Sequence, residues 1–269
     1  MLYTKASAGG ETIDVLQCDN CGLVRLSEVM DEPDEFYRDS GMRDGCADSL
    51  EMLRLETKDD DERRFRFTEK MITNKRVLDF GCGDGGYLQR AKMVANEVCG
   101  VEMEVVVRKA LQAEHFRCYE SVAEVGQVDV VTMFHVLEHL PNPIEVLNEI
   151  MEHVAPDGMV IVEVPNANDA LLSLYHCDAF SDFTYWKCHL YLYTMDTLRQ
   201  LVKKAGLRIK FMQQVQRYPL ANHLYWLSKG KPGGHMKWAI LNEKNLDKDY
   251  GDKLAKLGIA DTIIAIIRK

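Results

Sequence analysis

The sequence predicts an α/β fold built on a doubly wound, mostly parallel sheet. Two observations predict it: from Arg76 onward apolar runs alternate with helical segments, and residues 128–134 and 159–164 are hydrophobic at nearly every position. Such continuous hydrophobicity indicates strands buried on both faces, as in a parallel sheet covered by helices. The 269 residues, 46% of them hydrophobic, suffice for one mid-sized unit with small additions or for two small domains.

Seven apolar runs are expected to form the strands, at residues 76–80, 97–102, 116–119, 128–134, 159–164, 207–214 and 262–268. Helices are expected between them. Asn142 can cap a helix that has Pro143 at its first position, and Thr194 can cap another that ends near Gly206. Between these helices the chain is expected to turn at Pro156-Asp157-Gly158.

Three segments are expected along the chain. Residues 1–60 comprise a short hairpin and an acidic connector, residues 61–215 form the ligand-binding core, and residues 216–269 supply an insertion and the last core strand. The insertion is rich in aromatic and basic side chains. It is expected to be a substrate lid or, alternatively, a surface hairpin or a dimer contact.

Charge and composition exclude several classes of protein. The net charge is −9, with an acidic excess in residues 28–62 and a basic excess in residues 203–269. The basic tail carries no recognisable nucleic-acid-reading motif, so it either faces an anionic small substrate or is solvated surface. No apolar stretch approaches the ~20 residues of a membrane span, and no signal-peptide core begins the chain. We therefore expect a cytoplasmic protein with mostly reduced thiols, a monomer or homodimer, with no membrane or nucleic-acid partner.

A glycine-rich loop spans residues 77–88, VLDFGCGDGGYL, where a strand ends and a helix begins. Its spacing fits a dinucleotide pattern through Gly81, Gly83 and Gly86. It also fits D-x-G-x-G-x-G, through Asp79 and the glycines up to Gly85. A structural glycine turn is a third alternative.

Asp79 favours the second pattern. A carboxylate at the end of an apolar strand is costly unless it meets a cation. An amino-acid ammonium group supplies that charge, whereas pyrophosphate has the wrong sign. Glu102 ends the next strand, where an acid can bind both ribose hydroxyls. S-adenosylmethionine therefore fits this loop better than NAD.

These motifs resemble the class I S-adenosylmethionine-dependent methyltransferases, over roughly residues 60–269, and in particular their small-molecule, sugar- or quinone-type branch. The matching segments are VLDFGCGDG, VCGVEME, VDVVTMFHVLEHLPNP, APDG with MVIVEVPN, and HLYLYTMDTLRQLVKKAGL. The resemblance implies a Rossmann-like sheet with an antiparallel last strand. It also implies a donor site in which Asp79 faces the ammonium group, Glu102 the ribose and Met103 the adenine. The other residues implied in that site are Gly81, Cys82, Gly83, Gly85, Tyr87, Phe134 and His135.

Two further motifs carry metal-ligand residue types. His135-Val-Leu-Glu138-His139 matches the inverted zincin pattern, but Pro141 and Pro143 interrupt the long helix that a zinc protease needs. The alternatives are that these histidines lie near the methyl donor or hold the loop in place.

Cys18-x-x-Cys21 resembles the second knuckle of a zinc ribbon. A closed zinc site needs four ligands, yet no first knuckle precedes it and Cys46 is the one other cysteine before the core. Either zinc takes ligands from elsewhere or the hairpin is metal-free.

Transfer of a methyl group to a hydroxyl needs alignment and a base. The candidate catalytic residues are His135, His189 and His223. The candidate substrate-binding residues are Tyr37, Arg43, Tyr185, Arg217 and Tyr218. The favoured acceptor is a hydroxyl, less so an amine, of a small polar metabolite, in particular a sugar or phosphorylated sugar conjugate for a surface polysaccharide. The alternatives are a quinone or other aromatic O-methyltransferase, a non-catalytic cofactor-binding protein and a nicotinamide dehydrogenase.

Overall fold

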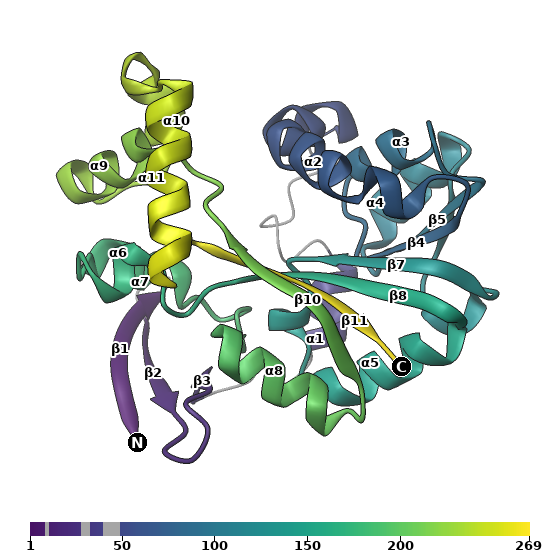
Figure 1. Cartoon of the computed structure of the whole chain (residues 1–269), viewed down its shortest axis with the longest axis horizontal. Coiled ribbons are helices and arrows are strands. Elements are labelled where there is room, and N and C mark those ends of the chain that lie inside the picture. Colours follow the sequence, from purple (N-terminus) through teal and green to yellow (C-terminus); the bar gives the residue numbers. More distant parts are fainter. Residues whose placement is uncertain (9–10, 28–32, 40–48) are drawn as a thin grey trace.

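The computed structural model describes residues 1–8, 11–27, 33–39 and 49–269 and confirms the α/β fold (Figure 1). A seven-stranded sheet has the order β10-β11-β8-β7-β4-β5-β6. Its strands are β4 (Arg76–Phe80), β5 (Glu97–Val101), β6 (Arg117–Tyr119), β7 (Val128–Phe134), β8 (Val154–Pro165), β10 (Arg208–Val215) and β11 (Thr262–Arg268). All seven predicted strands are present.

The sheet is parallel except at β11, which runs antiparallel to both β8 and β10. The strand order reverses between β4 and β7, and ligands of open α/β sheets bind outside the carboxyl ends of the strands at such a point. β8 starts earlier than predicted. The expected turn at Pro156-Asp157-Gly158 lies inside it, where the pairing with β7 shifts register between Val128 and Val130.

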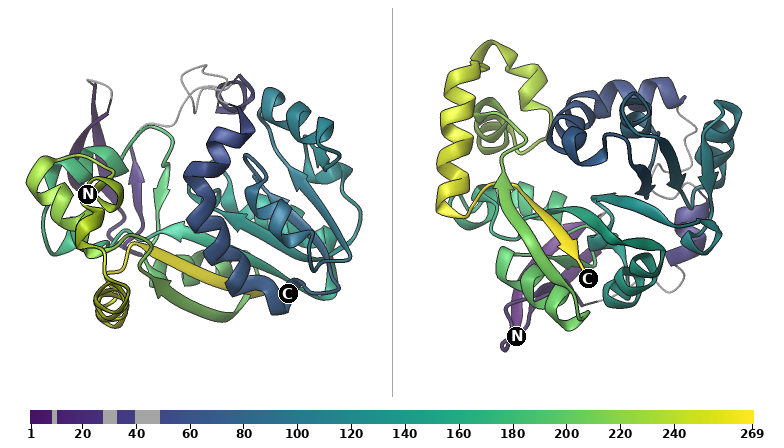
Figure 2. Two further views of the ribbon diagram at one scale, coloured as in Figure 1. Left: turned by 90° about the horizontal axis from the view of Figure 1, so that it is seen from above. Right: turned by 45° about the vertical axis from the view of Figure 1, so that its right-hand side comes forward.

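Helices cover both faces of the sheet (Figure 2). Val77 packs with α2 (Leu50–Ile72) and α3 (Gly86–Ala91), whereas its neighbour Leu78 packs with α5 (Pro143–His153) and α8 (Met195–Lys204). α4 (Val105–Ala113) follows β5, and two short turns, η2 (Val122–Glu124) and η3 (Leu137–His139), flank β7. Successive side chains of a strand thus pack against helices on opposite faces of the sheet.

The helix starts of α5 and α8 agree with the sequence. Pro143 occupies the first turn of α5, although the side chain of Asn142 before it makes no capping hydrogen bond. Thr194 Oγ1 accepts a hydrogen bond from the backbone N–H of Thr197 at the start of α8. Gly206 follows α8 with φ +74°, a left-handed conformation that suits glycine at a helix end.

The described parts of the acidic connector, residues 33–39 and 49–60, are largely helical, which was not predicted from the sequence. α2 begins after Ser49, whose side chain accepts from the N–H of Met52, and it runs through residue 60, the expected boundary of the core. Its buried positions include Asp61 and Thr68 beside Phe65 and Ile72. Because paired charges lie on its inner face, the helix lacks a clear apolar stripe.

The N-terminal hairpin is part of a larger sheet. β2 (Glu11–Gln17) and β3 (Val24–Leu26) form the predicted hairpin around Cys18 and Cys21, and β1 (Leu2–Ala8) and β9 (Tyr191–Leu192) complete the order β1-β2-β3-β9. β9 comes from the core, so this sheet joins residues far apart in the sequence. A short helix, α1 (Pro33–Arg38), follows it.

The insertion between β10 and β11 is helical. It comprises α9 (Leu220–Lys229), α10 (Gly234–Lys237), η4 (Ala239–Leu241) and α11 (Lys244–Leu257). α6 (Ala170–Ser173) and α7 (Asp178–Thr184) lie between these helices and the N-terminal sheet (Figures 1 and 2). All of these elements gather at the side of the core where β8 and β10 end.

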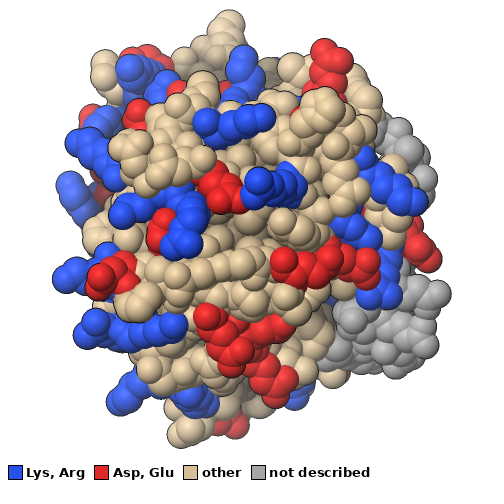
Figure 3. Space-filling view, turned by 90° about the vertical axis from the view of Figure 1, so that its right-hand side faces the viewer, with Lys and Arg blue, Asp and Glu red and all other residues tan. Residues whose placement is uncertain are grey.

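No helix in the described part of the chain is long and apolar enough to cross a membrane. On the face shown in Figure 3, acidic side chains gather at the lower centre, and basic side chains predominate along the left margin.

Candidate active site

The glycine loop leaves β4 at the point where the strand order reverses. Gly81 has φ +73°, and a Cβ atom there would lie 2.5 Å from Cγ2 of Val136. Gly83 has φ +51°, and a Cβ atom there would meet nothing within 4 Å. The first glycine therefore permits close packing, and the second borders open space in which a ligand can approach the backbone.

Two carboxylates flank this loop. Asp79 is 3% exposed, and its Oδ1 accepts a hydrogen bond from Thr132 Oγ1 at 2.7 Å. Burial raises the pKa of Asp79 to about 7, so a cationic ligand would favour its charged form. Glu102 accepts hydrogen bonds from the backbone N–H groups of Gly83 (2.8 Å) and Glu104 (2.9 Å), which fixes it between the loop and the end of β5.

Other predicted donor-site residues lie around the loop in different ways. Cys82 is buried with its sulfur 3.8 Å from that of Cys118, and Tyr87 is buried with its hydroxyl 2.8 Å from Thr68 Oγ1. These two side chains pack beneath the loop. Met103 and Phe134 are half-buried, and Phe134 meets the ring of Tyr87 edge-on at 4.9 Å. Gly85 caps α3 in a left-handed conformation.

His135 directly follows β7 and is strained. Its φ is +55°, which is uncommon for a residue other than glycine and is often found at functional sites. Its Nδ1 lies 3.1 Å from Oε1 of Glu138, which is completely buried on η3. Burial acts to raise the pKa of Glu138, but the hydrogen bond from His135 holds it below its usual value.

His139 and His189 lie beside Glu138. The Nδ1 of His139 is 2.8 Å from the carbonyl oxygen of Cys188 and 3.2 Å from the hydroxyl of Tyr37. The Nδ1 of His189 is 2.8 Å from the carbonyl oxygen of Thr184. Burial lowers the pKa of both histidines, that of His189 to about 4, so both are neutral near pH 7.

A network of partly buried charges lies against His135. Arg217 donates from Nη1 to Nε2 of His135 at 2.9 Å and forms an ion pair with Asp60 of α2. Arg63 and Arg64, also of α2, bind the fully buried Glu163 of β8 at 2.8 and 3.0 Å. These α2 residues were not predicted from the sequence, because no motif in the acidic segment sets them apart from solvated charges.

A cavity of about 290 Å³ opens beside His135. It lies between the carboxyl end of the sheet and the helical insertion. Its lining combines polar groups with aromatic rings: His135, His189, His223, Asn166, Asp169, Asn222, Arg217, Asp261, Tyr218, Phe180, Phe183 and Trp226, among others. Five predicted catalytic or substrate-binding residues thus meet in one cavity: His135, His189, His223, Arg217 and Tyr218.

The remaining predicted residues lie elsewhere or are otherwise engaged. Tyr185 is 1% exposed and packs with the N-terminal sheet, away from the cavity. Tyr37 approaches His139 from α1, and Arg43 lies outside the described residues. His223 has both ring nitrogens in use, toward Tyr250 Oη at 2.6 Å and toward Gln216 Nε2 at 3.2 Å.

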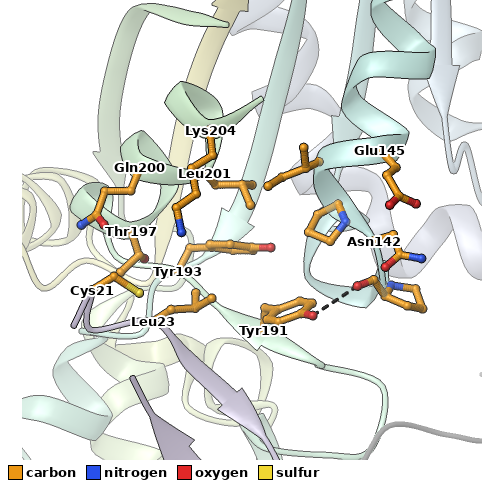
Figure 4. A pocket seen from close by; sticks show the side chains of 13 residues that line it. Cys21, Leu23, Asn142, Glu145, Tyr191, Tyr193, Thr197, Gln200, Leu201 and Lys204 are labelled. Atoms are coloured by element: carbon orange, nitrogen blue, oxygen red, sulfur yellow. Dashed lines mark hydrogen bonds between the residues drawn. The ribbon is translucent and has the colours of Figure 1, made fainter. Parts of the chain in front are cut away.

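A second cavity, of about 300 Å³, borders residues 141–145 between β7 and α5 (Figure 4). α5, α8 and β9 form it together with Cys21 and Leu23, and Tyr191 donates a hydrogen bond to the carbonyl of Pro141 at its edge. Neither cavity is lined by any part of the glycine loop, and His135 is the one predicted donor-site residue that lines either of them, in the first cavity.

Cys18 and Cys21 lie at the turn of the hairpin, exposed and half-exposed respectively. Backbone N–H groups of Cys21 and Asn20 lower the pKa of the Cys18 thiol. Within the described residues, neither cysteine belongs to a group of three side chains able to hold a metal ion. Cys46 lies outside those residues.

The sheet order and the glycine loop define a Rossmann-like, nucleoside-binding protein. A family model described as a methyltransferase domain matches residues 52–210, more than half of the chain. The chain belongs to the class I S-adenosylmethionine-dependent methyltransferases, and S-adenosylmethionine is its methyl donor. The alternatives of a dehydrogenase and of a purely structural glycine turn are thereby set aside. The buried Asp79 carboxylate and the open space over Gly83 fit this donor.

Three relatives illustrate the range of the family. A ubiquinone biosynthesis O-methyltransferase of Thiobacillus denitrificans is 31% identical over 116 residues, 38% of this chain and 49% of that protein. The C-methyltransferase NovU of Streptomyces niveus is 27% identical over 78% of this chain and 50% of that protein. The chain thus spans about half the length of these curated relatives. The crystal structure of a methyltransferase from Archaeoglobus fulgidus aligns with 82% of this chain and 99% of its own, with a TM-score of 0.55 and 20% identity, and shows the same fold.

Proposed function

We propose that the protein methylates a hydroxyl group of a small polar metabolite, with His135 as the general base. The observation that carries this proposal is the cavity beside His135, in which a histidine oriented by a buried carboxylate meets hydrogen-bonding side chains. A nucleophile's base that is itself oriented by a third group is typical of such catalysis.

On the donor side, Asp79 would bind the ammonium group and Glu102 the ribose hydroxyls, with the glycine loop along the methionine part. When bound, S-adenosylmethionine supplies a methyl group on a positively charged sulfur, which is already activated for displacement. The protein therefore has to align the acceptor with the methyl carbon and remove a proton.

His135 is poised to accept that proton. In this proposal its Nδ1–H donates to Glu138, and Nε2 carries the lone pair that accepts from Arg217 at 2.9 Å, with Oε1 of Glu163 3.3 Å from the same nitrogen. An acceptor hydroxyl would take the place of that arginine N–H as the donor to Nε2. As the oxygen–carbon bond forms and the carbon–sulfur bond breaks, the hydroxyl proton passes to Nε2, and Glu138 stabilises the imidazolium.

The lining of the cavity favours a neutral, sugar-like acceptor. Asn166, Asp169 and Asn222 offer hydrogen bonds, while Phe180, Phe183 and Trp226 offer flat apolar faces. The charge of Arg217 is already offset by Asp60. Lys229 and Lys231 belong to the insertion that we expected to form a substrate lid, but they are exposed and do not line the cavity. A phosphorylated acceptor is therefore less favoured than a neutral one.

A phenol is the second candidate acceptor. The aromatic rings of the cavity can stack on it, and a ubiquinone biosynthesis O-methyltransferase is among the relatives. Transfer to carbon, as the name of NovU states for that relative, would use the same histidine to remove a proton from carbon.

Release of S-adenosylhomocysteine, measured over fractions of a bacterial metabolite extract, tests the proposal. Mass spectrometry of the methylated product then identifies the acceptor. Turnover in a polar fraction that resists phosphatase supports the neutral, sugar-like acceptor, and turnover in a lipophilic fraction supports the phenol. Donor binding without turnover in any fraction would contradict the catalytic role and favour a binding protein.

A further inference from the structure

Glu138, His139 and His189 form a cluster that the proposed chemistry does not use in full. One potential ligand atom from each lies within 4.8 Å of the others. Glu138 and His139 belong to η3, and His189 precedes β9. The cluster thus connects the segment after β7 with the segment that leads into β9 of the N-terminal sheet. It is the one cluster of this kind in the described part of the chain.

The charge of Glu138 is incompletely satisfied. Its side chain is 0% exposed, its Oε1 accepts from His135, and its Oε2 has no hydrogen-bond partner. A carboxylate has about four acceptor positions, and a buried charge is costly unless donors or a cation surround it. The two nearest histidines do not provide that compensation.

The tautomers of these histidines explain why. The carbonyls of Cys188 and Thr184 can only accept, so each histidine carries its proton on Nδ1. The Nε2 lone pairs are then unprotonated, and that of His139 lies 4.0 Å from Glu138 Oε1. Two lone pairs and a carboxylate therefore face a shared, buried space in which no donor is supplied by these three groups.

We propose that Glu138, His139 and His189 bind a divalent transition-metal cation, of the class of Zn²⁺ or Mn²⁺. Two neutral imidazoles and one carboxylate form a common ligand set of metal sites that keep an open position. Metal-bound histidines usually donate their other N–H to a backbone carbonyl, as both do here. Bonds of about 2.0–2.2 Å would draw the three ligand atoms closer together.

One of the three proposed ligands borders the cavity in which we propose that the acceptor binds. His189 lines the acceptor cavity, whereas Glu138 and His139 lie behind it. If the proposed function holds, the open position of the cation faces the acceptor, whose hydroxyl pKa it would lower beside His135. Binding of the cation itself does not depend on that function.

Cobalt titration of the full-length protein tests the proposal. The protein is treated with a chelator, dialysed and titrated with Co²⁺ by absorption spectroscopy and with Zn²⁺ by calorimetry. The starting protein carries Cys18→Ser and Cys21→Ser, so that the hairpin thiols cannot supply the ligands. We expect about one equivalent to bind without a sulfur-to-cobalt absorption band.

Two variants and a matched control locate the site. Glu138→Gln and His189→Asn should each weaken binding by more than about 100-fold, since even changes outside the ligand shell cost 10–100-fold. His153→Asn removes a histidine whose Nδ1 is likewise 2.7 Å from a carbonyl, that of Val125, and should leave affinity unchanged. Circular dichroism and S-adenosylhomocysteine binding report folding independently.

Absence of saturable binding in the starting protein would overturn the proposal. So would unchanged affinity in a folded His189→Asn variant. A cation that binds as expected but does not alter turnover would leave the metal site standing and remove only its link to the acceptor.

Discussion

Arg217 donates a hydrogen bond from Nη1 to Nε2 of His135 at 2.9 Å, and its Nε lies 3.0 Å from Oδ1 of Asp60. The three residues come from the segment after β10, the end of β7 and helix α2. One guanidinium thus ties the insertion, the sheet and the covering helix together. It also occupies the histidine nitrogen that the acceptor would reach in the proposed reaction.

Asp60→Asn should lower the free energy of unfolding by about 2 kcal/mol. Losing one partner of a fully buried ion pair costs about 3–5 kcal/mol, and the pair here is about a fifth exposed, so screening reduces the loss. Urea denaturation measures the change. The double variant Asp60→Asn with Arg217→Met should recover part of the loss, and purely additive effects would mean that the pair is not coupled.

Asp79→Asn should weaken S-adenosylhomocysteine binding at least about tenfold, equivalent to about 1.4 kcal/mol. The substitution keeps the shape of the side chain and removes the charge that would face the ammonium group. Calorimetry gives the dissociation constant. The control is Asp129→Asn, which breaks a 2.8 Å ion pair with Arg76 at the amino ends of β4 and β7, away from the glycine loop. Equal affinity in both variants would remove Asp79 from the donor site.

Donor binding should strengthen as the pH rises from 6 to 8. Burial raises the pKa of Asp79 to about 7, so at pH 6 only about a tenth of the molecules carry the carboxylate and at pH 8 about nine tenths do. The affinity for S-adenosylhomocysteine should therefore rise nearly tenfold over this range. In Asp79→Asn the same titration should be flat, and a persisting slope would assign the dependence to another group.

His135→Asn should reduce kcat by about 10²- to 10⁴-fold, the usual contribution of a general base, with little effect on donor affinity. Asparagine tolerates the left-handed backbone at φ +55°. His135→Val should be equally inactive and, in addition, about 1–2 kcal/mol less stable, because a β-branched residue is strained there. Steady-state kinetics and urea denaturation separate the two effects. Full turnover in the asparagine variant would exclude His135 as the base.

Asp169→Asn should stabilise the protein at pH 8 by more than about 1 kcal/mol and leave its stability at pH 4 nearly unchanged. Burial raises the pKa of Asp169 to about 8, so the folded state keeps a proton that the unfolded chain loses above pH 4, and stability falls between these values. Asparagine can still accept the 2.7 Å hydrogen bond from the N–H of Leu171. The exposed Asp178→Asn is the control for denaturation curves at both pH values.

The sequence predicted the sheet well because its signals are local. Each buried strand is a continuous apolar run, and the glycines after Phe80 serve a turn that few other residues can form. The same holds for the start of α5, where Pro143 lies in the first turn. It also holds for the hairpin around Cys18 and Cys21.

The parts that were missed depend on contacts between distant residues. Asp60 resembles any surface acid until folding sets it against Arg217, 157 positions away. β9 has only two residues and gains its partner from β3. The grouping of His189 with Glu138 and His139 likewise arises from the fold, since no spacing in the sequence relates it to the motif after β7.

The pairing of β3 with β9 connects the N-terminal hairpin to the segment of the core that carries His189. β9 begins two residues after His189, and Val24 and Arg25 pair with Leu192 and Tyr191. The catalytic domain matched by the family starts only at residue 52. A shortened enzyme that begins at that residue would leave β9, the strand after His189, without its partner β3. A transfer of this core to another protein therefore has to include the N-terminal hairpin.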